Sequence, residues 1–413
     1  MALLVQYGNG IVGPIQIDGP ASLPYDIDLG PLLLSDYYYK AADEIAFVGG
    51  APPASDNVLI NGSQSNPTTG VGSFHNISFT PGKRHRLRII NTSVENHFQV
   101  SISNHTMTII EADLVPVNAF TTDSLFVGIG QRYDVTVDAS QAIDNYWLNI
   151  TFGGSNLCGR SNNLNPAAII RYENASNSNP TYSGVTPIDH QCLDLLDLTP
   201  VVTRTVPTTG FTPSANNSLD VGFSLTTGKW TINSSSLVVD WEIPLSEIII
   251  DDKTDWLPSN NVWQIEQANT WAFYLIQNDP VVPLPHPIHL HGHDFVVLGR
   301  SPDSTAAAPT LYNFTSSDIS SLTVNNPVRR DVTMLPAGGW IVIAFQTDNP
   351  GQWLMHCHIA WHVAGGLGVT FLERPSDFRA SVKQADIDVL KDQCSAWNQY
   401  YPSDIYQQYD SGV

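Results

Sequence analysis

The sequence predicts an all-β protein built from two consecutive Greek-key β-sandwich or barrel units. Short, alternating, β-branched segments recur along the chain between Gly, Pro, Asn and Asp residues, as strands joined by turns do. Parts of the first half also resemble parts of the second half, which indicates that one unit is present twice. Helical patterns are sparse, and the best of them covers residues 377–397, with Ser376 as its N-cap.

The expected strands form two groups in chain order. In the first half they are residues 73–80, 84–91, 105–111, 132–138 and 147–152. In the second half they are residues 230–233, 262–267, 271–277, 289–299, 330–334 and 340–346. The internal similarity pairs residues 130–138 and 145–150 with 339–345 and 351–358, and residues 96–105 with 286–295. We therefore place one domain at residues 18–198 and the next at 199–413, with the boundary at the start of a Pro- and Thr-rich stretch.

Composition and charge limit the classes of function. The 413 residues are 42% hydrophobic, which is enough for two or three cores. A formal net charge of -21 excludes nucleic acid as a natural partner, because phosphate binding depends on clustered cations. No stretch approaches the roughly 18 consecutive apolar residues of a membrane span, so we expect no membrane partner.

Several features favour a secreted, extracellular glycoprotein. Sequons of the form Asn-x-Ser/Thr begin at Asn61, Asn76, Asn91, Asn104, Asn149, Asn174, Asn216, Asn233 and Asn313. Cys158 and Cys192 lie in loop-like contexts and suit a disulfide in an oxidising compartment. The opening residues 1–5 are too short and uncharged for a signal peptide, so we expect that the natural beginning of the chain is missing.

The histidines gather in two motifs of the second half. HPIHLHGH occupies residues 286–293, and HCHIAWH occupies residues 356–362. Alternate side chains of a strand share a face, so His289 and His291 point one way, as do His356 and His358, while Cys357 points the other way. The spacing therefore predicts two metal sites, one on each face of the strand that carries Cys357.

On the Cys357 face, the ligands that can converge are the thiolate, His286 and His362. A His₂Cys set is typical of blue copper electron-transfer sites, whereas structural zinc prefers four closed ligands. An axial ligand would come from position 367, and Leu367 has no donor atom. The missing axial donor disfavours Cu(II) and should raise the reduction potential.

On the opposite face, four imidazoles without a thiolate fit copper in a cluster that binds oxygen, although zinc and iron are not excluded by ligand type alone. These are His289, His291, His356 and His358. For His293 we expect a supporting or structural role, because the second motif has no counterpart to it. The scattered histidines are interpreted as structural: His75, His85, His97, His105 and His190.

The two motifs, read as HPIHLHGH and HCHIAWHVAGGL, resemble the C-terminal copper signatures of the multicopper oxidases. Their surroundings resemble an ascomycete fungal laccase, through YGNG at 7–10, GPASLPYD at 19–26, DNVLING at 56–62, PGKRHRLR at 81–88 and RRDVTMLPAGGW at 329–340. The resemblance covers nearly the whole chain. It implies cupredoxin-like domains, copper as the cofactor, and a role in lignin degradation.

The resemblance also implies roles for individual residues. His286, Cys357 and His362 would bind the type 1 copper, His289 the type 2 copper, and His291, His356 and His358 the type 3 pair. Phenolic or aromatic amine substrates would lose single electrons at the type 1 copper, and dioxygen would be reduced to water at the trinuclear cluster. A complete laccase holds up to four copper ions.

A phenol pocket follows from the same resemblance. Glu95 would accept the phenolic proton, which makes oxidation easier, and His362 would be the electron entry. The walls would be Ala51, Pro52, Leu157, Trp230, Leu284 and Trp361. The C-terminal residues Asp410, Ser411, Gly412 and Val413 resemble the laccase plug, whose terminal carboxylate enters the channel toward the cluster.

The sequence departs from the family at its beginning. A fungal laccase has three cupredoxin domains, and the first supplies two further His-x-His pairs, which this chain lacks. Residues 1–17 would be a remnant of that domain, with residues 6–17 as its last strand. The cluster would then keep four of eight imidazoles, and Cys394 would lose its family partner.

Three hypotheses follow from the sequence. The first is a working laccase, with another chain supplying the missing first domain. The second is a non-catalytic blue copper electron-transfer module that carries only the type 1 site. The third is a zinc-dependent hydrolase, whose activity should survive replacement of Cys357 by Ser.

Overall fold

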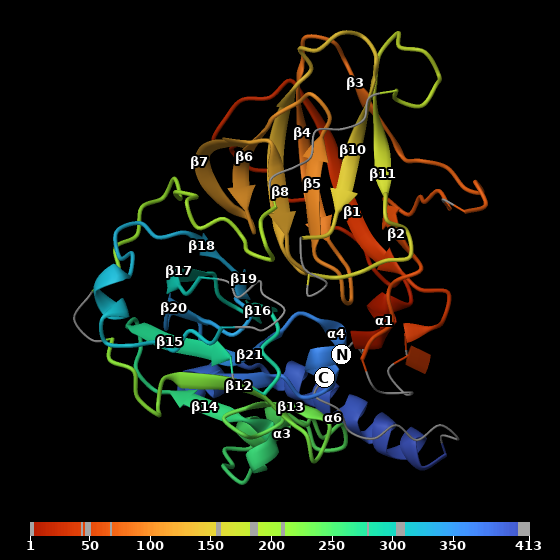
Figure 1. Ribbon diagram of the computed structural model, residues 1–413. Helices are drawn as coiled ribbons and strands as arrows, with labels where there is room; N and C mark the ends of the chain where they lie inside the picture. The colour runs from red at the N-terminus through yellow and green to blue at the C-terminus, as the bar shows by residue number, and fades with distance from the viewer. Residues whose placement is uncertain are drawn as a thin grey trace.

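The computed structural model describes residues 4–42, 44–45, 51–66, 68–153, 158–181, 189–207, 211–278, 281–302 and 310–403. Four β-sheets dominate this part of the chain, and they form two units that lie against each other (Figure 1). The first unit is drawn in red to yellow, and the second in green to blue. The predicted all-β fold is confirmed.

The first unit packs a sheet of six strands on a sheet of five. In sheet order, the larger contains β2 (Asn57–Ile60), β1 (Ile27–Tyr37), β4 (Arg84–Asn91), β9 (Arg132–Asp138), β6 (Met107–Ala112) and β7 (Val115–Thr122). The smaller contains β3 (Asn76–Phe79), β11 (Ala167–Tyr172), β10 (Asn145–Thr151), β5 (Phe98–Ile102) and β8 (Ser124–Val127).

The second unit repeats this arrangement. Its larger sheet contains β13 (Lys229–Ile232), β12 (Ser218–Ser224), β15 (Trp271–Asn278), β20 (Trp340–Gln346), β17 (Phe295–Arg300) and β18 (Arg329–Arg330). Its smaller sheet contains β14 (Val262–Ile265), β22 (Gly368–Glu373), β21 (Gly351–Cys357), β16 (His286–Leu290) and β19 (Val332–Leu335).

The duplication predicted from the sequence is confirmed strand by strand. Adding eleven to each strand number of the first unit gives the strand order of both sheets of the second. The three pairs of similar segments fall on β9 and β20, on β10 and β21, and on β5 and β16. The chain therefore contains the same scaffold twice, and the metal-binding motifs lie in the second copy only.

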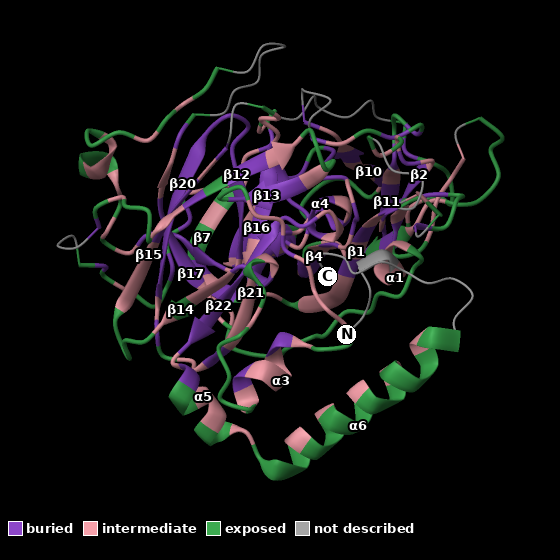
Figure 2. Cartoon of the chain, turned by 90° about the horizontal axis from the view of Figure 1, so that it is seen from below, coloured by how far each residue is buried: buried purple, intermediate pink, exposed green. Residues whose placement is uncertain are grey.

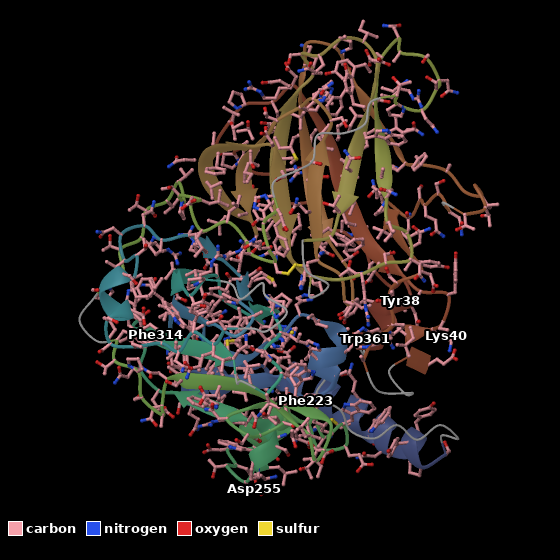
Figure 3. The ribbon with its side chains drawn as sticks, in the orientation of Figure 1. Tyr38, Lys40, Phe223, Asp255, Phe314 and Trp361 are labelled. Carbon is pink, nitrogen blue, oxygen red and sulfur yellow. A yellow bond between two sulfur atoms is a disulfide. The ribbon has the colours of Figure 1, made fainter. Side chains whose placement is uncertain are left out.

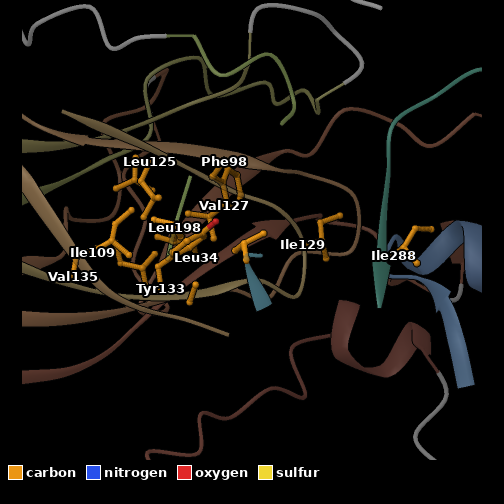
Figure 4. Close-up of a cluster of buried hydrophobic side chains, with 14 of the residues drawn as sticks. Leu34, Phe98, Ile109, Leu125, Val127, Ile129, Tyr133, Val135, Leu198 and Ile288 are labelled. Carbon is orange, nitrogen blue, oxygen red and sulfur yellow. The ribbon is translucent and has the colours of Figure 1, made fainter. Parts of the chain in front are cut away.

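Apolar side chains on the inner faces of the sheets form the cores. Leu34, Phe98, Ile109 and Val135 are among the fully buried residues of the first unit. Figure 4 shows Ile129 extending from this cluster toward Ile288 of the second unit. Because buried side chains from both units join one continuous cluster, the second unit's metal-binding strands are held partly by the first.

Buried ion pairs also join the two units. The guanidinium of Arg330 donates to Asp113 at 2.9 Å and to Asp194 at 2.8 Å, and all three side chains are fully buried. Arg132 forms a two-pronged pair with Asp331 at 2.6 and 2.7 Å. Pairs that are hydrogen-bonded on both oxygens fix orientation as well as contact, so this interface is specific.

The Cys158–Cys192 disulfide is present, as predicted. It packs on Phe126 of the first unit and on Met334 of the second. The disulfide therefore closes a loop of the first unit at the place where the two units meet.

The described residues contain few helices, and all but α6 are short. They are α1 (Leu4–Gly8), α3 (Leu245–Ile250), α4 (Ala360–Ala364), α5 (Pro375–Ser381) and α6 (Gln384–Tyr400), with 3₁₀ turns η1 (Pro258–Asn260), η2 (Asp318–Ser321) and η3 (Tyr401–Ser403). Figure 2 shows α6 as a largely exposed helix at the edge of the molecule. Within the described ranges, none of the helices has the length and apolarity to cross a membrane.

Three expectations about elements were wrong. Residues 6–17 form the end of α1 and irregular chain instead of a strand, because no described strand pairs with them; Ile15 is 84% exposed. The helix expected at 377–397 is two helices, because Val382 and Lys383 are extended between α5 and α6, and Ser376 lies inside α5. The strand expected at 289–299 is two strands in different sheets, separated by a turn at Gly292, whose φ is 73°.

Candidate copper centre

The metal-binding motifs meet where β16 pairs with β21. The antiparallel register places Ile288 opposite Cys357 and His289 opposite His356. Residues that face each other across an antiparallel pair point to the same side. The pairing therefore puts Cys357 on the inner face of the sheet and the His289–His356 pair on the outer face, as the alternation predicted.

On the inner face, Cys357 and two histidines form what we call the trigonal site. The Cys357 Sγ lies 3.6 Å from the Nδ1 of His286 and 3.6 Å from the Nδ1 of His362, and these two Nδ1 atoms are 3.2 Å apart. His286 comes from β16 and His362 from α4, which follows β21 directly. All three side chains are buried.

The donor set of the trigonal site fits copper. Burial lowers the pKa of His286 to about 3 and also lowers that of His362, so both imidazoles are neutral and can donate a lone pair. Burial raises the pKa of the Cys357 thiol, and a bound cation would release its proton. Two imidazoles and one thiolate form the ligand set of blue copper sites.

Two hydrophobic residues border the trigonal site. The Trp230 ring centroid lies 4.9 Å from that of His286 and 4.3 Å from that of His362. Leu367 is fully buried in the same core as Cys357, and its backbone oxygen accepts the Cys357 N–H at 3.1 Å. Leu367 thus holds the backbone of the thiol ligand while offering no donor from its side chain.

On the outer face, His289, His291 and His356 bring ligand nitrogens within 4.8 Å of one another. The ring of His358 lies 5.6 Å from those of His289 and His356. We call these four residues the imidazole cluster. His291 and His358 each follow the last residue of a strand instead of lying within it. The face predicted from strand alternation is correct for both, although neither lies within a strand.

Hydrogen bonds orient the imidazoles of this cluster. The Nδ1–H of His289 donates to the backbone oxygen of Asp331 at 2.8 Å, and that of His356 donates to the backbone oxygen of Cys357 at 2.7 Å. Each bond leaves Nε2 as the nitrogen that can bind a metal, and the Nε2 of His356 lies 3.2 Å from that of His291. Fixing one ring nitrogen in this way is typical of metal-binding histidines. A cavity of about 550 Å³ adjoins His289 and His291. The donor set and the adjoining space fit copper ions that react with a small molecule.

The remaining histidines have supporting places. The Nε2 of His293 lies 2.8 Å from a buried carboxylate oxygen of Glu373, in line with the expected supporting role. Hydrogen bonds hold four of the scattered histidines: His75, His85, His105 and His190. His97 accepts the N–H of Ile129 at 3.1 Å, while its Nε2 is buried without a partner.

The expected phenol pocket is only partly assembled in the described residues. Trp361 precedes His362 on α4 and meets the ring of Tyr38 at 6.4 Å (Figure 3). The Oε2 atom of Glu95 is buried without a hydrogen-bond partner. Pro52 accepts a hydrogen bond from Arg160 at 2.6 Å, Ala51 is exposed, and Leu284 packs at the edge of the core. Leu157 lies outside the described residues, as do Asp410, Ser411, Gly412 and Val413 of the expected plug.

Near Glu95 the structure places residues that the sequence did not reveal. The hydroxyls of Tyr7 and Tyr38 and the indole Nε1 of Trp361 are buried without partners, like Glu95 Oε2. Tyr7, Tyr38 and Trp361 belong to one apolar cluster with Val94. Four unpaired polar atoms around one apolar cluster fit a ligand with an aromatic ring and a hydroxyl. No local motif signals these residues, because they come from α1, from the residue after β1, and from α4.

Two copies of a β-sandwich with a trigonal His₂Cys site and an imidazole cluster define a protein of the copper-oxidase class. Two multicopper oxidase profiles match the chain, at residues 28–175 and 221–377. The chain belongs to the multicopper oxidase family. Copper is therefore its cofactor, and the chain is a laccase-like oxidoreductase.

The similar proteins agree with this assignment. A laccase of Cryphonectria parasitica is 66% identical over 99% of this chain and 70% of its own length. Laccase-1 of Melanocarpus albomyces is 56% identical over 99% of this chain and 67% of its own length. Among solved structures, the laccase from Botrytis aclada is 38% identical with a TM-score of 0.89, over 99% of this chain and 75% of that chain.

Proposed function

We propose that the chain oxidises phenols by one electron at the trigonal site and passes the electrons to dioxygen at the imidazole cluster. The observation that carries the proposal is the β16–β21 register. It places the thiol of Cys357 and the imidazole of His356 on opposite faces of the same strand, one residue apart. His356 and His358 flank Cys357 in sequence, so the covalent chain provides a short path between the two sites.

Copper held by His286, Cys357 and His362 would accept single electrons, and copper held by the imidazole cluster would deliver them to dioxygen. Four phenols that each lose one electron and one proton balance one dioxygen reduced to two waters. Within this scheme we assign His289 to the type 2 copper and His291, His356 and His358 to the type 3 pair. The side chain of Leu367 would offer no donor atom to copper held by His286, Cys357 and His362.

Glu95 is the proposed proton acceptor. Burial and, to a smaller extent, the nearby Asp36 raise its pKa to about 8, although Arg160 lowers it. In its ionised form, a carboxylate of this basicity accepts a phenolic proton more readily than an ordinary glutamate does. Trp361 and Trp230 would exclude water beside His362, and Ala51, Pro52, Leu157 and Leu284 would complete the walls of the pocket.

The imidazole cluster offers four imidazoles within the 413 residues, and the cavity of about 550 Å³ beside it leaves room for further ligands. We propose that another polypeptide segment supplies those ligands when dioxygen is reduced. A chain with the trigonal site alone would be an electron-transfer module.

Copper content and oxygen consumption test the proposal. The wild-type chain should bind several copper ions and consume oxygen in the presence of 2,6-dimethoxyphenol. Cys357→Ser should lose the blue absorption and the phenol oxidation, while Cys394→Ser, a change at the other free cysteine, should keep both. One copper per chain without oxygen uptake would favour the electron-transfer module, and a colourless chain that binds zinc and consumes no oxygen would favour a zinc hydrolase.

We also propose that the protein is a secreted glycoprotein without nucleic-acid or membrane partners. Seven sequon asparagines are exposed: Asn61, Asn76, Asn104, Asn174, Asn216, Asn233 and Asn313. Asn91 is buried, and its amide donates to two backbone oxygens, so it cannot carry a glycan in this fold. Intact mass before and after enzymatic deglycosylation tests the proposal, and an unchanged mass would contradict it.

A further inference from the structure

The loop that carries Glu95 is held by a buried carboxylate from another strand. Asp36, near the end of β1, accepts the backbone N–H groups of Val94 at 2.9 Å, Glu95 at 2.9 Å and Asn96 at 3.1 Å. Its own N–H donates to Ser93 Oγ at 3.1 Å. The side chain is 9% exposed. One carboxylate thus binds three successive N–H groups, which fixes the turn between β4 and β5.

The same turn is bonded to the helix of the trigonal site. The backbone oxygen of Val94 accepts the N–H of Ala360 at 2.9 Å, and Ala360 is the first residue of α4. Trp361 and His362 follow on that helix. Asp36 therefore lies at one end of a hydrogen-bonded path that joins the proposed proton acceptor to the proposed electron entry.

We propose that Asp36 is a positioning residue for phenol oxidation, which holds the turn of Glu95 in register with α4 so that proton and electron leave the same substrate. The inference rests on the proposed function of Glu95 and His362. Oxidation of a phenol removes both particles, so the base and the electron acceptor must be reached from one bound position. Nothing in this role requires Asp36 to touch the substrate.

The charge of Asp36 adds a second effect. Asp36 is a neighbouring acid that raises the pKa of Glu95 beyond the effect of burial. Burial raises the pKa of Asp36 itself to about 6, although the three N–H groups oppose this. The other charged or titratable groups that interact with Glu95 are Arg160, Tyr7, Tyr38 and Cys357. Removing the charge of Asp36 should therefore make Glu95 less basic.

The test is the variant Asp36→Asn in the full, copper-loaded chain. The rate at which its blue absorption is bleached is measured without oxygen for two electron donors. One donor is 2,6-dimethoxyphenol, and the other is ferrocyanide, which carries no phenolic proton. This readout needs no oxygen reduction. The rate constant with the phenol should fall about tenfold or more, and that with ferrocyanide should change less than about twofold. Asp28→Asn, on the same strand but bonded to Gly30 and Arg88, is the matched control and should change neither rate.

A double-mutant cycle separates this inference from the proposed function. In a Glu95→Gln background, Asp36→Asn should have little further effect on the phenol rate. If Glu95→Gln leaves the phenol rate unchanged, the proposed proton acceptor is wrong. If Glu95→Gln slows the reaction and Asp36→Asn does not, or if Asp36→Asn slows both donors equally, only the role of Asp36 is overturned.

A second readout does not use the loaded enzyme. In the copper-free protein, infrared titration of the Glu95 carboxyl, assigned by its loss in Glu95→Gln, should show a pKa lower by about one unit in Asp36→Asn. An unchanged pKa would refute the electrostatic part. Should Asp36→Asn fail to fold, Asp36→Glu keeps the charge and moves the carboxylate by one methylene. This variant must then lower the rate constant with the phenol and leave that with ferrocyanide unchanged. Rate constants equal to those of the wild type would refute the positioning role.

Discussion

The turn at Gly130 of the first unit provides a sharp test of how the imidazole cluster is held. Gly130 has a φ of 80°, and a Cβ atom built on it would lie 2.4 Å from Cδ2 and 2.7 Å from Nε2 of His358. Contacts below 3.4 Å are tighter than most real ones, so Gly130→Ala must push the His358 ring away by about 1 Å. Metal–ligand distances tolerate only about 0.2 Å. We therefore expect copper loss from the cluster, with the blue trigonal site retained.

The assay is copper per chain together with the blue absorption. Gly82→Ala is the matched control, because Gly82 has a φ of 76° and no atom within 4 Å of the added Cβ. Both variants should lose about 1–2 kcal/mol of folding free energy from the left-handed backbone, which denaturant unfolding measures. Only Gly130→Ala should lose copper. Full copper content in Gly130→Ala would show that the first unit does not position His358.

Three further predictions concern the interface, the disulfide and pH. Arg132→Gln breaks the ion pair with Asp331, whose backbone oxygen accepts the N–H of His289. The free energy of unfolding, measured in urea, should fall by about 1.5–3 kcal/mol, and an unchanged midpoint would contradict this. Cys158 and Cys192 are 34 residues apart, and replacing both by Ala should lower the free energy of unfolding by about 3–4 kcal/mol in the same assay. A loss below about 1 kcal/mol would refute this prediction. Glu95 binds a proton more tightly in the folded chain, where its pKa is about 8, than in the unfolded chain, where it is 4.5. Its contribution to the free energy of unfolding therefore falls as the pH rises between these values. The melting temperature of Glu95→Gln should therefore rise relative to that of the wild type between these pH values. Parallel curves of melting temperature against pH would refute the raised pKa of Glu95.

Local sequence patterns predicted what depends on neighbours in the chain. The bounds of β4 and β9 agree with the predicted segments 84–91 and 132–138, because alternation and flanking turn residues define a strand locally. The separation of Cys357 from its flanking histidines also followed from a local rule, the alternation of side chains. Even where His358 lies beyond the strand end, the chain has not yet turned far enough to move it to the other face.

Contacts between distant segments could not be predicted in this way. Asp36 lies 59 residues from Glu95, and their hydrogen bond depends on how β1 sits beside β4. A single sequence does not specify that register, because sliding one strand along another preserves every local pattern. The break of the strand after Leu290 was missed for a related reason. The turn at Gly292 packs its backbone on the ring of Trp353, more than sixty residues away.

Comparison of the two units shows why only the second has a candidate metal centre. On the inner face of β5 and β10 the facing pairs are Ile102–Leu148 and Val100–Ile150, and on β16 and β21 they are Leu290–Met355 and Ile288–Cys357. Matching these inner-face pairs moves β10 by one residue along β21 relative to the alignment of the two sequences. Ile150 then stands in the place of Cys357.

The outer faces differ in the same way. Ser101 and Asn149 stand opposite each other in the first unit, where His289 and His356 do in the second. Short polar side chains and one isoleucine thus replace imidazoles and a thiol on an otherwise equal scaffold. The first unit instead contributes Gly130, which packs on the ring of His358, and Arg132, which forms an ion pair with Asp331. Its role in the copper centre is therefore to support ligands that belong to its own duplicate.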